Sequence, residues 1–277
     1  MYLAHFGLSE MPFGITPDTQ FIYAGSSHQS ALNTLLVAHQ TGEGFIKVTG
    51  EVGTGKTLLC RRFLAQLDSN TVAAYIPNPM QEPRALLTSV AEEFGAVVGN
   101  DAAFLIKSLN RRLLELAAEG KQALLCIDEA QTIPPLALES IRLLSNLETE
   151  KRKLLQIVLF GQPELDEKLA APSARQLLQR IVFHHDIAPL PKRELQAYLD
   201  HRMQVAGHRG ESVFLPSATR LIHRHSAGTP RLVNILAHKA LLAAWGEGRH
   251  RVTATMVRRA AADTQGAKHP RWWQLSF

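Results

Sequence analysis

The sequence predicts an α/β protein with a doubly wound parallel sheet of five strands, followed by a small all-helical domain. Short apolar runs alternate with helical patterns from about residue 45 to residue 187, an order typical of a parallel sheet covered by helices on both faces. Beyond Pro189-Leu190-Pro191 only helical patterns follow. A glycine-rich loop joins the first strand to the helix after it, and this order is that of a phosphate-binding unit.

The strands and helices of the sheet domain follow from hydrophobic periodicity and from the turn residues that bound each segment. The strands are predicted at residues 45–49, 71–76, 123–127, 154–160 and 181–187. The helices are predicted at residues 30–39, 58–67, 84–94, 101–120, 136–147 and 164–169. Asp101 can cap one of these helices, and Gly120 can end it.

The helical patterns after residue 190 define a second domain. They cover residues 193–205, 217–225, 231–245 and 253–263, with glycine-containing breaks between them. We therefore expect a sheet domain over residues 1–190, a helical lid over 191–265 and an aromatic tail over 266–277. In residues 1–30 several aromatic side chains stand among prolines and glycines, which predicts a strap lying over the sheet domain. These side chains are Phe6, Phe13, Phe21 and Tyr23.

The composition is that of an ordinary globular protein. Hydrophobic residues make up 45% and charged residues 20% of the chain, and no run approaches the roughly 18 apolar residues of a membrane span. No signal peptide is visible, and Cys60 and Cys126 lie in apolar segments that favour reduced core thiols. These observations predict a cytoplasmic protein. The net charge of +5 allows an acidic partner such as DNA, although the basic residues are scattered along the chain.

The loop after the first strand fits the phosphate-loop pattern G-x-x-x-x-G-K-[ST]. It contains, in order, Gly50, Glu51, Val52, Gly53, Thr54, Gly55, Lys56 and Thr57, and Leu58 follows in the helix. The glycines allow backbone N–H groups to point inward, and the helix N-terminus adds a positive dipole. We expect Lys56 to reach the β- and γ-phosphates of a nucleotide and the Thr57 hydroxyl to hold Mg²⁺.

The third strand ends in two acidic residues. Asp128 and Glu129 follow the apolar run 123–127, and buried parallel strands deliver their C-terminal residues to the ligand crevice of a sheet. Asp128 is expected to help hold Mg²⁺. Glu129 is expected to orient and deprotonate an attacking water molecule. The pair therefore predicts hydrolysis of the bound nucleotide.

Four further polar residues are candidates to act on the γ-phosphate. Gln162 follows the strand at 154–160 and can sense the phosphate there, or else it belongs to a helix-capping turn. Arg175 and Arg180 precede the last strand, and Arg231 opens a helix of the second domain. A guanidinium matches the negative charge that spreads over the γ-phosphate oxygens during transfer.

Together these motifs resemble those of AAA+ ATPases, and more closely those of ExeA/GspA-type secretion ATPases. Besides the phosphate loop, the resemblance rests on Asp128-Glu129-Ala130-Gln131, Gly161-Gln162-Pro163-Glu164-Leu165, Gly228-Thr229-Pro230-Arg231, Phe6-Gly7-Leu8, Pro12-Phe13, Thr16-Pro17-Asp18 and His28. It covers about residues 2–265 and implies a P-loop NTPase fold of the AAA+ type with a helical lid.

The resemblance implies roles for single residues and implies ATP or ADP with Mg²⁺ as the ligands. Lys56 and Thr57 match Walker A, and Asp128 and Glu129 match Walker B. Gln162 matches sensor 1, a position where the family more often has Asn, Ser or Thr. Arg180 matches the arginine finger, with Arg175 as the alternative, and Arg231 matches sensor 2. Pro12 and Phe13 would lie near the adenine.

The resemblance also implies partners: a ring of identical subunits, and pilus or secretion assembly proteins that can be membrane-bound. The protein is then cytoplasmic and peripheral to the inner membrane. ExeA-type relatives continue into a transmembrane helix and a peptidoglycan-binding domain, whereas this chain stops at Phe277. That length resembles the ATPase of the mannose-sensitive haemagglutinin (MSHA) type IV pilus.

Two other functions share the same core pattern. One is a DNA-associated AAA+ ATPase of the transposition-helper type. In that case DNA should stimulate ATP hydrolysis, and the affinity for DNA should fall steeply as the salt concentration rises. The other is a binding module that holds ATP as a conformational switch and scarcely hydrolyses it. The intact Glu129 argues against the binding module.

The C-terminal tail is rich in large apolar residues for a chain end. Trp272, Trp273, Leu275 and Phe277 lie in the last six residues, after a polar linker at 266–271. The tail either folds back onto its own lid or core, or docks on a partner, since tryptophans make good interface anchors.

Overall fold

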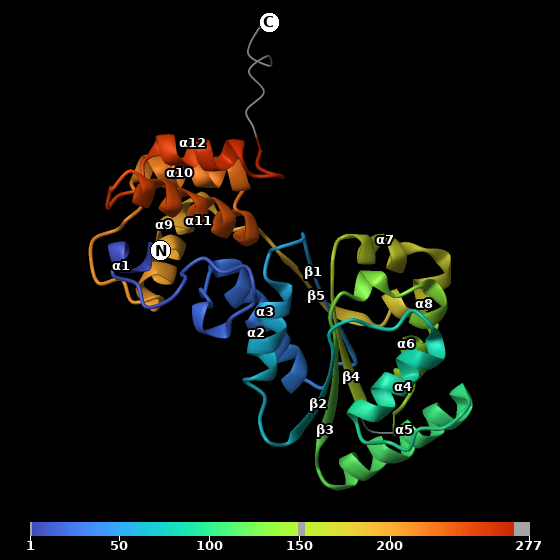
Figure 1. Cartoon of the computed structure of the whole chain (residues 1–277). Coiled ribbons are helices and arrows are strands. Elements are labelled where there is room, and N and C mark those ends of the chain that lie inside the picture. Colours follow the sequence, from blue (N-terminus) through green and yellow to red (C-terminus); the bar gives the residue numbers. More distant parts are fainter. Residues whose placement is uncertain (1, 149–152, 269–277) are drawn as a thin grey trace, which may run out of the picture. The chain divides into compact units, whose positions relative to one another are not determined.

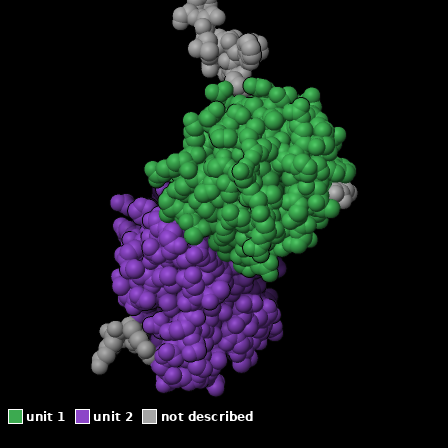
Figure 2. Space-filling view, turned by 90° about the vertical axis from the view of Figure 1, so that its left-hand side faces the viewer, with its two compact units in different colours: residues 1–27, 53–55, 188–277 green, residues 28–52, 56–187 purple. Residues whose placement is uncertain are grey.

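The computed structural model describes residues 2–148 and 153–268, and the chain divides into two compact units (Figure 2). The helical unit comprises residues 1–27, 53–55 and 188–277, and the sheet unit comprises residues 28–52 and 56–187. The aromatic residues of the tail lie outside the described residues. In the described part of the chain, no helix combines the length and the apolar character needed to cross a membrane.

The sheet unit contains one five-stranded sheet with the strand order β2-β3-β4-β1-β5 (Figure 1). The strands are β1 (Phe45–Gly50), β2 (Thr71–Ile76), β3 (Gln122–Ile127), β4 (Leu155–Gly161) and β5 (Ile181–Ile187). All neighbouring pairs are parallel, so the carboxyl ends of the strands meet at one edge. The predicted five-stranded parallel sheet is confirmed.

Helices cover both faces of this sheet, because alternate residues of each strand point to opposite sides. On one face Val48 and Cys126 share a core with α2 and α3. On the other face Leu125 and Ile157 share a core with α4, α5 and α6. The helices of this unit are α2 (Ser26–Gln40), α3 (Lys56–Leu64), α4 (Pro83–Glu93), α5 (Ala102–Ala118), α6 (Pro135–Leu144), α7 (Glu164–Ala170) and the short α8 (Arg175–Leu178).

Gln156, a polar residue in the interior of β4, joins the end of α2 to the sheet. Its Nε2 donates to the carbonyl oxygens of Ala38, His39 and Glu43 at 3.0–3.3 Å. Its Oε1 therefore accepts, and the partner is Nδ1 of His39 at 2.6 Å. The last carbonyl groups of a helix have no partner within the helix, so Gln156 supplies them with donors just before β1 begins.

The helical unit contains the four long helices predicted after residue 190. They are α9 (Lys192–Val205), α10 (Pro216–Ser226), α11 (Pro230–Gly246) and α12 (Ala254–Ala262), and the N-terminal part adds α1 (Leu3–Phe6) and the 3₁₀ turn η1 (Thr19–Phe21). Across both units the predicted helix and strand ends differ from the observed ends by at most four residues. The short α1, η1 and α8 are additional elements without a periodic pattern.

Residues 1–27 cluster with the C-terminal helices, whereas the sequence led us to expect a strap over the sheet domain. The physical reason is aromatic burial in the core of the helical unit, which takes in Tyr2, Phe6, Phe13 and Phe21 at 1–3% exposure. The Arg202 guanidinium lies 4.8 Å from the centroid of the Phe21 ring and donates through Nε to the Pro12 carbonyl oxygen at 2.5 Å. The aromatic pattern predicts burial, but it does not identify the core that receives the side chains.

Gly228 permits a close approach of two backbone segments in the helical unit. Its φ is +79°, and a Cβ atom there would lie 2.2 Å from the carbonyl oxygen of Leu190. The Gly228 carbonyl oxygen in turn accepts the Leu190 N–H at 2.9 Å. Only glycine adopts this backbone conformation without cost and also leaves room for the neighbouring main chain.

We expect Gly228→Ala to destabilise the protein much more than the control Gly248→Ala. Gly248 also has a positive φ, +66°, but a Cβ atom there would meet nothing within 4 Å. Its replacement therefore costs only the roughly 1–2 kcal/mol of a left-handed residue, while Gly228→Ala adds a clash with a main-chain oxygen. Urea unfolding of both variants measures the difference. Equal losses would mean that the Leu190 segment moves aside at no cost.

Candidate active site

The loop between β1 and α3 curls around the side chain of Lys56. Gly53 and Gly55 have φ values of +80° and +97°, in the left-handed region that glycine enters readily. Lys56 is the first residue of α3 and is only 6% exposed. Its Nζ donates to the carbonyl oxygen of Gly50 at 2.8 Å and to that of Glu51 at 3.1 Å. The ammonium group is thus held at the carboxyl end of β1.

The environment of Lys56 suits an anionic ligand. Burial lowers its pKa, because removal from water disfavours the charged form, and the nearby carboxylates of Glu129 and Asp128 act in the opposite direction. The hydrogen-bond acceptors of Nζ are neutral carbonyl oxygens. Phosphate oxygens are stronger acceptors for an ammonium group than carbonyls are, so the loop, the lysine and the helix N-terminus fit a nucleotide phosphate.

Thr57 and Asp128, the two predicted metal ligands, are in direct contact. Thr57 Oγ1 donates to Asp128 Oδ2 at 2.5 Å, and the Glu129 N–H donates to Asp128 Oδ1 at 2.9 Å. Asp128 is 2% exposed, and this burial raises its pKa against the opposing effect of the two hydrogen bonds. Hydroxyl and carboxylate oxygens are the hard ligands that Mg²⁺ prefers, so the pair fits that ion.

Glu129 follows Asp128 with a φ of +51°, which is uncommon for a non-glycine residue and concentrates at functional sites. Two side-chain amides hold its carboxylate. Gln131 Nε2 donates to Glu129 Oε2 at 2.5 Å, and Gln162 Nε2 donates to the same oxygen at 3.2 Å. The structure therefore brings Gln162, at the end of β4, together with the acidic residue that follows β3.

Gln131 is a site residue to which the sequence analysis assigned no role. Its Oε1 accepts the backbone N–H of Gln162 at 3.0 Å, while its Nε2 donates to Glu129. Its main-chain oxygen also accepts from the ammonium group of Lys168. Gln131 thus links the ends of β3 and β4. The amide two residues after Glu129 was visible as part of a motif, but only the three-dimensional contact shows what it holds.

The two candidate arginine fingers differ in their surroundings. Arg180 Nη1 donates to the hydroxyl of Ser145, the residue after α6. Arg175 is exposed on α8. Either residue must reach an ATP molecule of a neighbouring subunit to act as a finger, so both roles stay predictions.

The remaining predicted residues lie in the helical unit. The backbone N–H of Arg231 donates to the carbonyl oxygen of Gly53 at 3.2 Å, and Gly53 is counted with the same unit. Phe13 is 3% exposed and meets the Phe214 ring edge to face at a centroid distance of 5.6 Å. The proposed roles of Arg231 at sensor 2 and of Pro12 and Phe13 near the adenine stay predictions.

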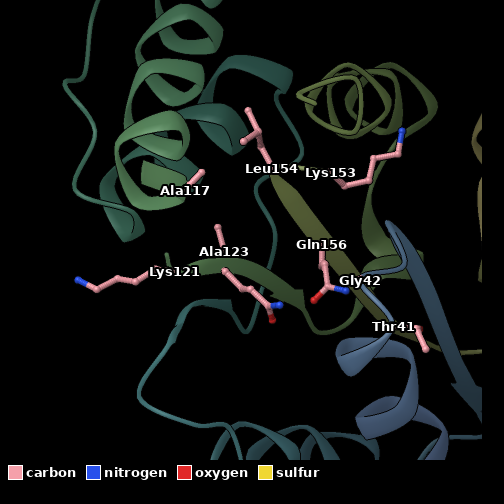
Figure 3. A pocket seen from close by; sticks show the side chains of 9 residues that line it. Thr41, Gly42, Ala117, Lys121, Ala123, Lys153, Leu154 and Gln156 are labelled. Carbon is pink, nitrogen blue, oxygen red and sulfur yellow. The ribbon is translucent and has the colours of Figure 1, made fainter. Parts of the chain in front are cut away.

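A hollow of about 210 Å³ in the sheet unit lies at the opposite strand ends (Figure 3). Its lining residues include Gln122, the first residue of β3, and Leu154, which directly precedes β4. The ammonium ends of Lys121 and Lys153 point away from its centre in Figure 3, and each pairs with a glutamate. Since parallel strands place the phosphate loop at their other ends, this hollow is separate from the candidate active site.

We expect Asp128→Asn to make the protein more stable at neutral pH. The asparagine oxygen can still accept from the Glu129 N–H, and its amide NH₂ group can donate to the Thr57 hydroxyl in place of the bond that Thr57 now donates. The side chain then carries no buried charge. Because the native pKa of Asp128 is raised, the folded state binds this proton more tightly than the unfolded chain, and stability falls as the pH rises between the two pKa values. The gain in melting temperature should therefore grow from about pH 4, the unfolded value, and level off above the native value. A gain that does not change with pH, or a loss at pH 7, would contradict the predicted charge penalty.

Comparison with known proteins agrees with this geometry. Residues 39–169 match the family model of the AAA domain. Over 276 residues the chain is 42% identical to general secretion pathway protein A of Aeromonas hydrophila. That match covers 99% of this chain and 50% of the relative, so the chain spans about half the length of the protein that it resembles.

Solved structures show the same fold at low sequence identity. The ORC2 protein of Aeropyrum pernix matches with a TM-score of 0.65 and 17% identity, over 90% of this chain and 72% of that one. The ORC1 protein of Aeropyrum pernix, solved in complex with DNA, matches with a TM-score of 0.65 and 20% identity, over 92% of this chain and 69% of that one. The chain therefore has the P-loop AAA fold, and nearly all of this chain is similar in sequence to about half of general secretion pathway protein A.

Proposed function

We propose that this protein binds ATP with Mg²⁺ at the loop between β1 and α3 and hydrolyses it to ADP and phosphate. The observation that carries the proposal is the contact of Thr57 with Asp128, beside the buried Lys56 and the amide-held Glu129. Each residue type has a use in phosphoryl transfer, because the reaction needs a cation at the phosphates, oxygen ligands for Mg²⁺ and a base for water.

The residues divide this work as follows. Backbone N–H groups of the loop and the Lys56 ammonium bind the phosphates, while Thr57 and Asp128 would hold Mg²⁺. Bound Mg²⁺ supplies positive charge that neutralises the phosphate oxygens. Glu129 accepts a proton from the water molecule that attacks the γ-phosphate.

Gln131 and Gln162 orient Glu129 for this proton transfer. Both amides donate to Oε2, which leaves Oε1 as the oxygen to receive the proton. The backbone N–H of Gln162 donates in turn to the side-chain oxygen of Gln131. A side chain that senses the γ-phosphate, as we propose for Gln162, would thus be mechanically linked to the base, and Gln131 is a positioning residue in this scheme.

We further propose that the ATPase serves the assembly of a secretion system or of an MSHA-like type IV pilus, next to the inner membrane and through protein partners. The similarity to general secretion pathway protein A supports this place. A ring of identical subunits with Arg180 or Arg175 as the finger would couple neighbouring sites. The cellular test is to produce Glu129→Gln in excess over the normal protein. Stalled rings should block secretion or piliation, and undisturbed levels of both would contradict the role.

The active-site assignments predict three separable defects. Lys56→Ala should lose nucleotide binding, because the phosphates lose their buried cation. Glu129→Gln should still bind ATP but turn over roughly 10²–10⁴ times more slowly, as expected for loss of a general base. Gln131→Ala loses its hydrogen bonds with both Glu129 and the Gln162 N–H. If the bond to Glu129 contributes about 1.4 kcal/mol to the transition state, kcat should fall roughly tenfold, while nucleotide affinity stays unchanged.

Calorimetric nucleotide binding and steady-state hydrolysis measure these three effects. Lys121→Ala, a charge change at the opposite strand ends, is the control for Lys56→Ala. Equal nucleotide affinity in Lys56→Ala and the unmodified protein would overturn the phosphate site. A raised KM with unchanged kcat in Gln131→Ala would show that Gln131 does not act through Glu129.

The finger proposal predicts rescue by mixing. A chain with Glu129→Gln has an intact finger, and a chain with Arg180→Ala has an intact base, so some interfaces of a mixed ring contain both working parts. Mixing should restore part of the activity, and specific activity should rise with protein concentration as rings form. The same experiment with Arg175→Ala decides between the two arginines. Activity independent of concentration, with no rescue for either arginine, would rule out a finger in trans.

A further inference from the structure

The excess positive charge of the chain lies in its C-terminal helices. Residues 188–268 contain 13 Lys and Arg residues against five Asp and Glu residues, whereas residues 1–187 contain 16 against 20. The net charge of +5 therefore conceals an acidic N-terminal part and a strongly basic C-terminal part. An asymmetry of this kind points to a polyanionic partner.

Part of this charge surrounds a hollow of about 510 Å³ on the helical unit. Four basic side chains from three helices line it, and all four are exposed. Lys192 opens α9, Arg220 and Arg224 stand one turn apart on α10, and Arg258 lies on α12. We call this feature the basic hollow.

None of the acidic residues in residues 188–268 neutralises the basic hollow. Each of the five accepts a hydrogen bond from a residue outside the lining. Glu194 accepts from the Ser26 N–H, and Asp200 accepts from Gln196 and Ser212. The other three accept from basic side chains: Glu211 from Arg251, Glu247 from Arg259 and Asp263 from Lys239. The lining contains no acidic residue. In the described part of the chain, none of the four cations forms an ion pair with an acidic side chain; the basic partners of Glu194, Glu211, Glu247 and Asp263 are other residues. Solvent and salt therefore screen their mutual repulsion, but no acidic side chain of the described residues offsets it.

The other lining groups also favour an anion. Ser217 adds a hydroxyl donor in the first turn of α10. The N-cap residue of α10, Leu215, provides no side-chain acceptor, and the first turn of α10 contains no acidic residue. The first N–H groups of α10 therefore add positive potential to a site that the four cations already define.

We propose that the basic hollow binds the sugar–phosphate backbone of double-stranded nucleic acid. Arginine, which supplies three of the four cations, matches phosphate oxygens with its planar fork of donors. The described lining contains no Phe, Tyr or Trp ring, and its one imidazole, that of His223, is half-buried and hydrogen-bonded to the Leu190 carbonyl oxygen at 3.2 Å. It therefore lacks the aromatic stacking platform that single-strand sites use. It also contains no exposed large apolar side chain that could enter a lipid bilayer.

Binding of this kind is independent of base sequence, because phosphate contacts position a protein without reading bases. It goes beyond the proposed ATPase activity and does not depend on it. Four phosphate contacts should give a slope of about −3.6 for the logarithm of the binding constant against the logarithm of the salt concentration.

The test compares two double variants of the full chain that remove the same charge. Arg220→Ala with Arg258→Ala changes the basic hollow. Arg251→Ala with Arg259→Ala is the matched control, because these arginines pair with Glu211 and Glu247 outside it. Fluorescence anisotropy with a 30-base-pair DNA duplex measures affinity and salt slope without nucleotide. All four positions are exposed, so both variants should fold, which circular dichroism checks.

We expect the hollow variant to bind the duplex on the order of tenfold more weakly at low salt, with a slope smaller by about 2, and the control to bind almost as well as the unmodified protein. Equal weakening in both variants would overturn the proposal, since general charge would then explain binding. Hollow-dependent binding of phosphatidylglycerol vesicles or polyglutamate, without duplex binding, would also overturn it and would assign the surface to a membrane or an acidic protein.

Discussion

A buried ammonium group must find polar or anionic partners close by, and this requirement organises the candidate site. Lys56 meets it at the carboxyl end of β1, which lies beside β4, which in turn lies beside β3. The parallel register brings the residues after these three strands to the same edge. The loop, the Asp128 and Glu129 carboxylates, and Gln162 are therefore neighbours because of strand order alone, and Gln131 completes the arrangement by tying two strand ends together.

Residues whose roles depend on local pattern could be predicted from the sequence. The phosphate loop and the acidic strand end lie where the strand, turn and helix signals of the sequence place them. The strands whose side chains contribute to a core on each face of the sheet are visible as continuous apolar runs. Gln131 and Gln156 could not be assigned, because their partners are far along the chain or depend on a side-chain rotamer. From the aromatic residues before Ser26 we correctly predicted that this segment is buried. Which of the two units receives these side chains depends on tertiary packing, which sequence periodicity does not encode.

The two units carry different electrostatic tasks. In the sheet unit, carboxylates surround one buried lysine, so that in the proposed function a bound phosphate and its metal ion would replace contacts that already exist. In the helical unit, the basic hollow has no acidic residue in its lining as far as the chain is described, so that a polyanion would relieve the repulsion among its four cations. If both proposals hold, the first arrangement selects a small ligand by geometry, while the second attracts an extended one by charge density.

The grouping of residues 1–27 with residues 188–268 has a consequence for biosynthesis. The sheet unit is inserted between two parts of the helical unit, so the aromatics of residues 2–23 leave the ribosome before the sheet unit but cannot be buried until the last helices are made. About 235 residues separate the end of the first part from the end of α12 at Ala262, and translation at about 5–20 residues per second makes the delay on the order of 10–50 s. The sheet unit can fold during this interval, while the nascent N-terminus presents apolar surface to chaperones.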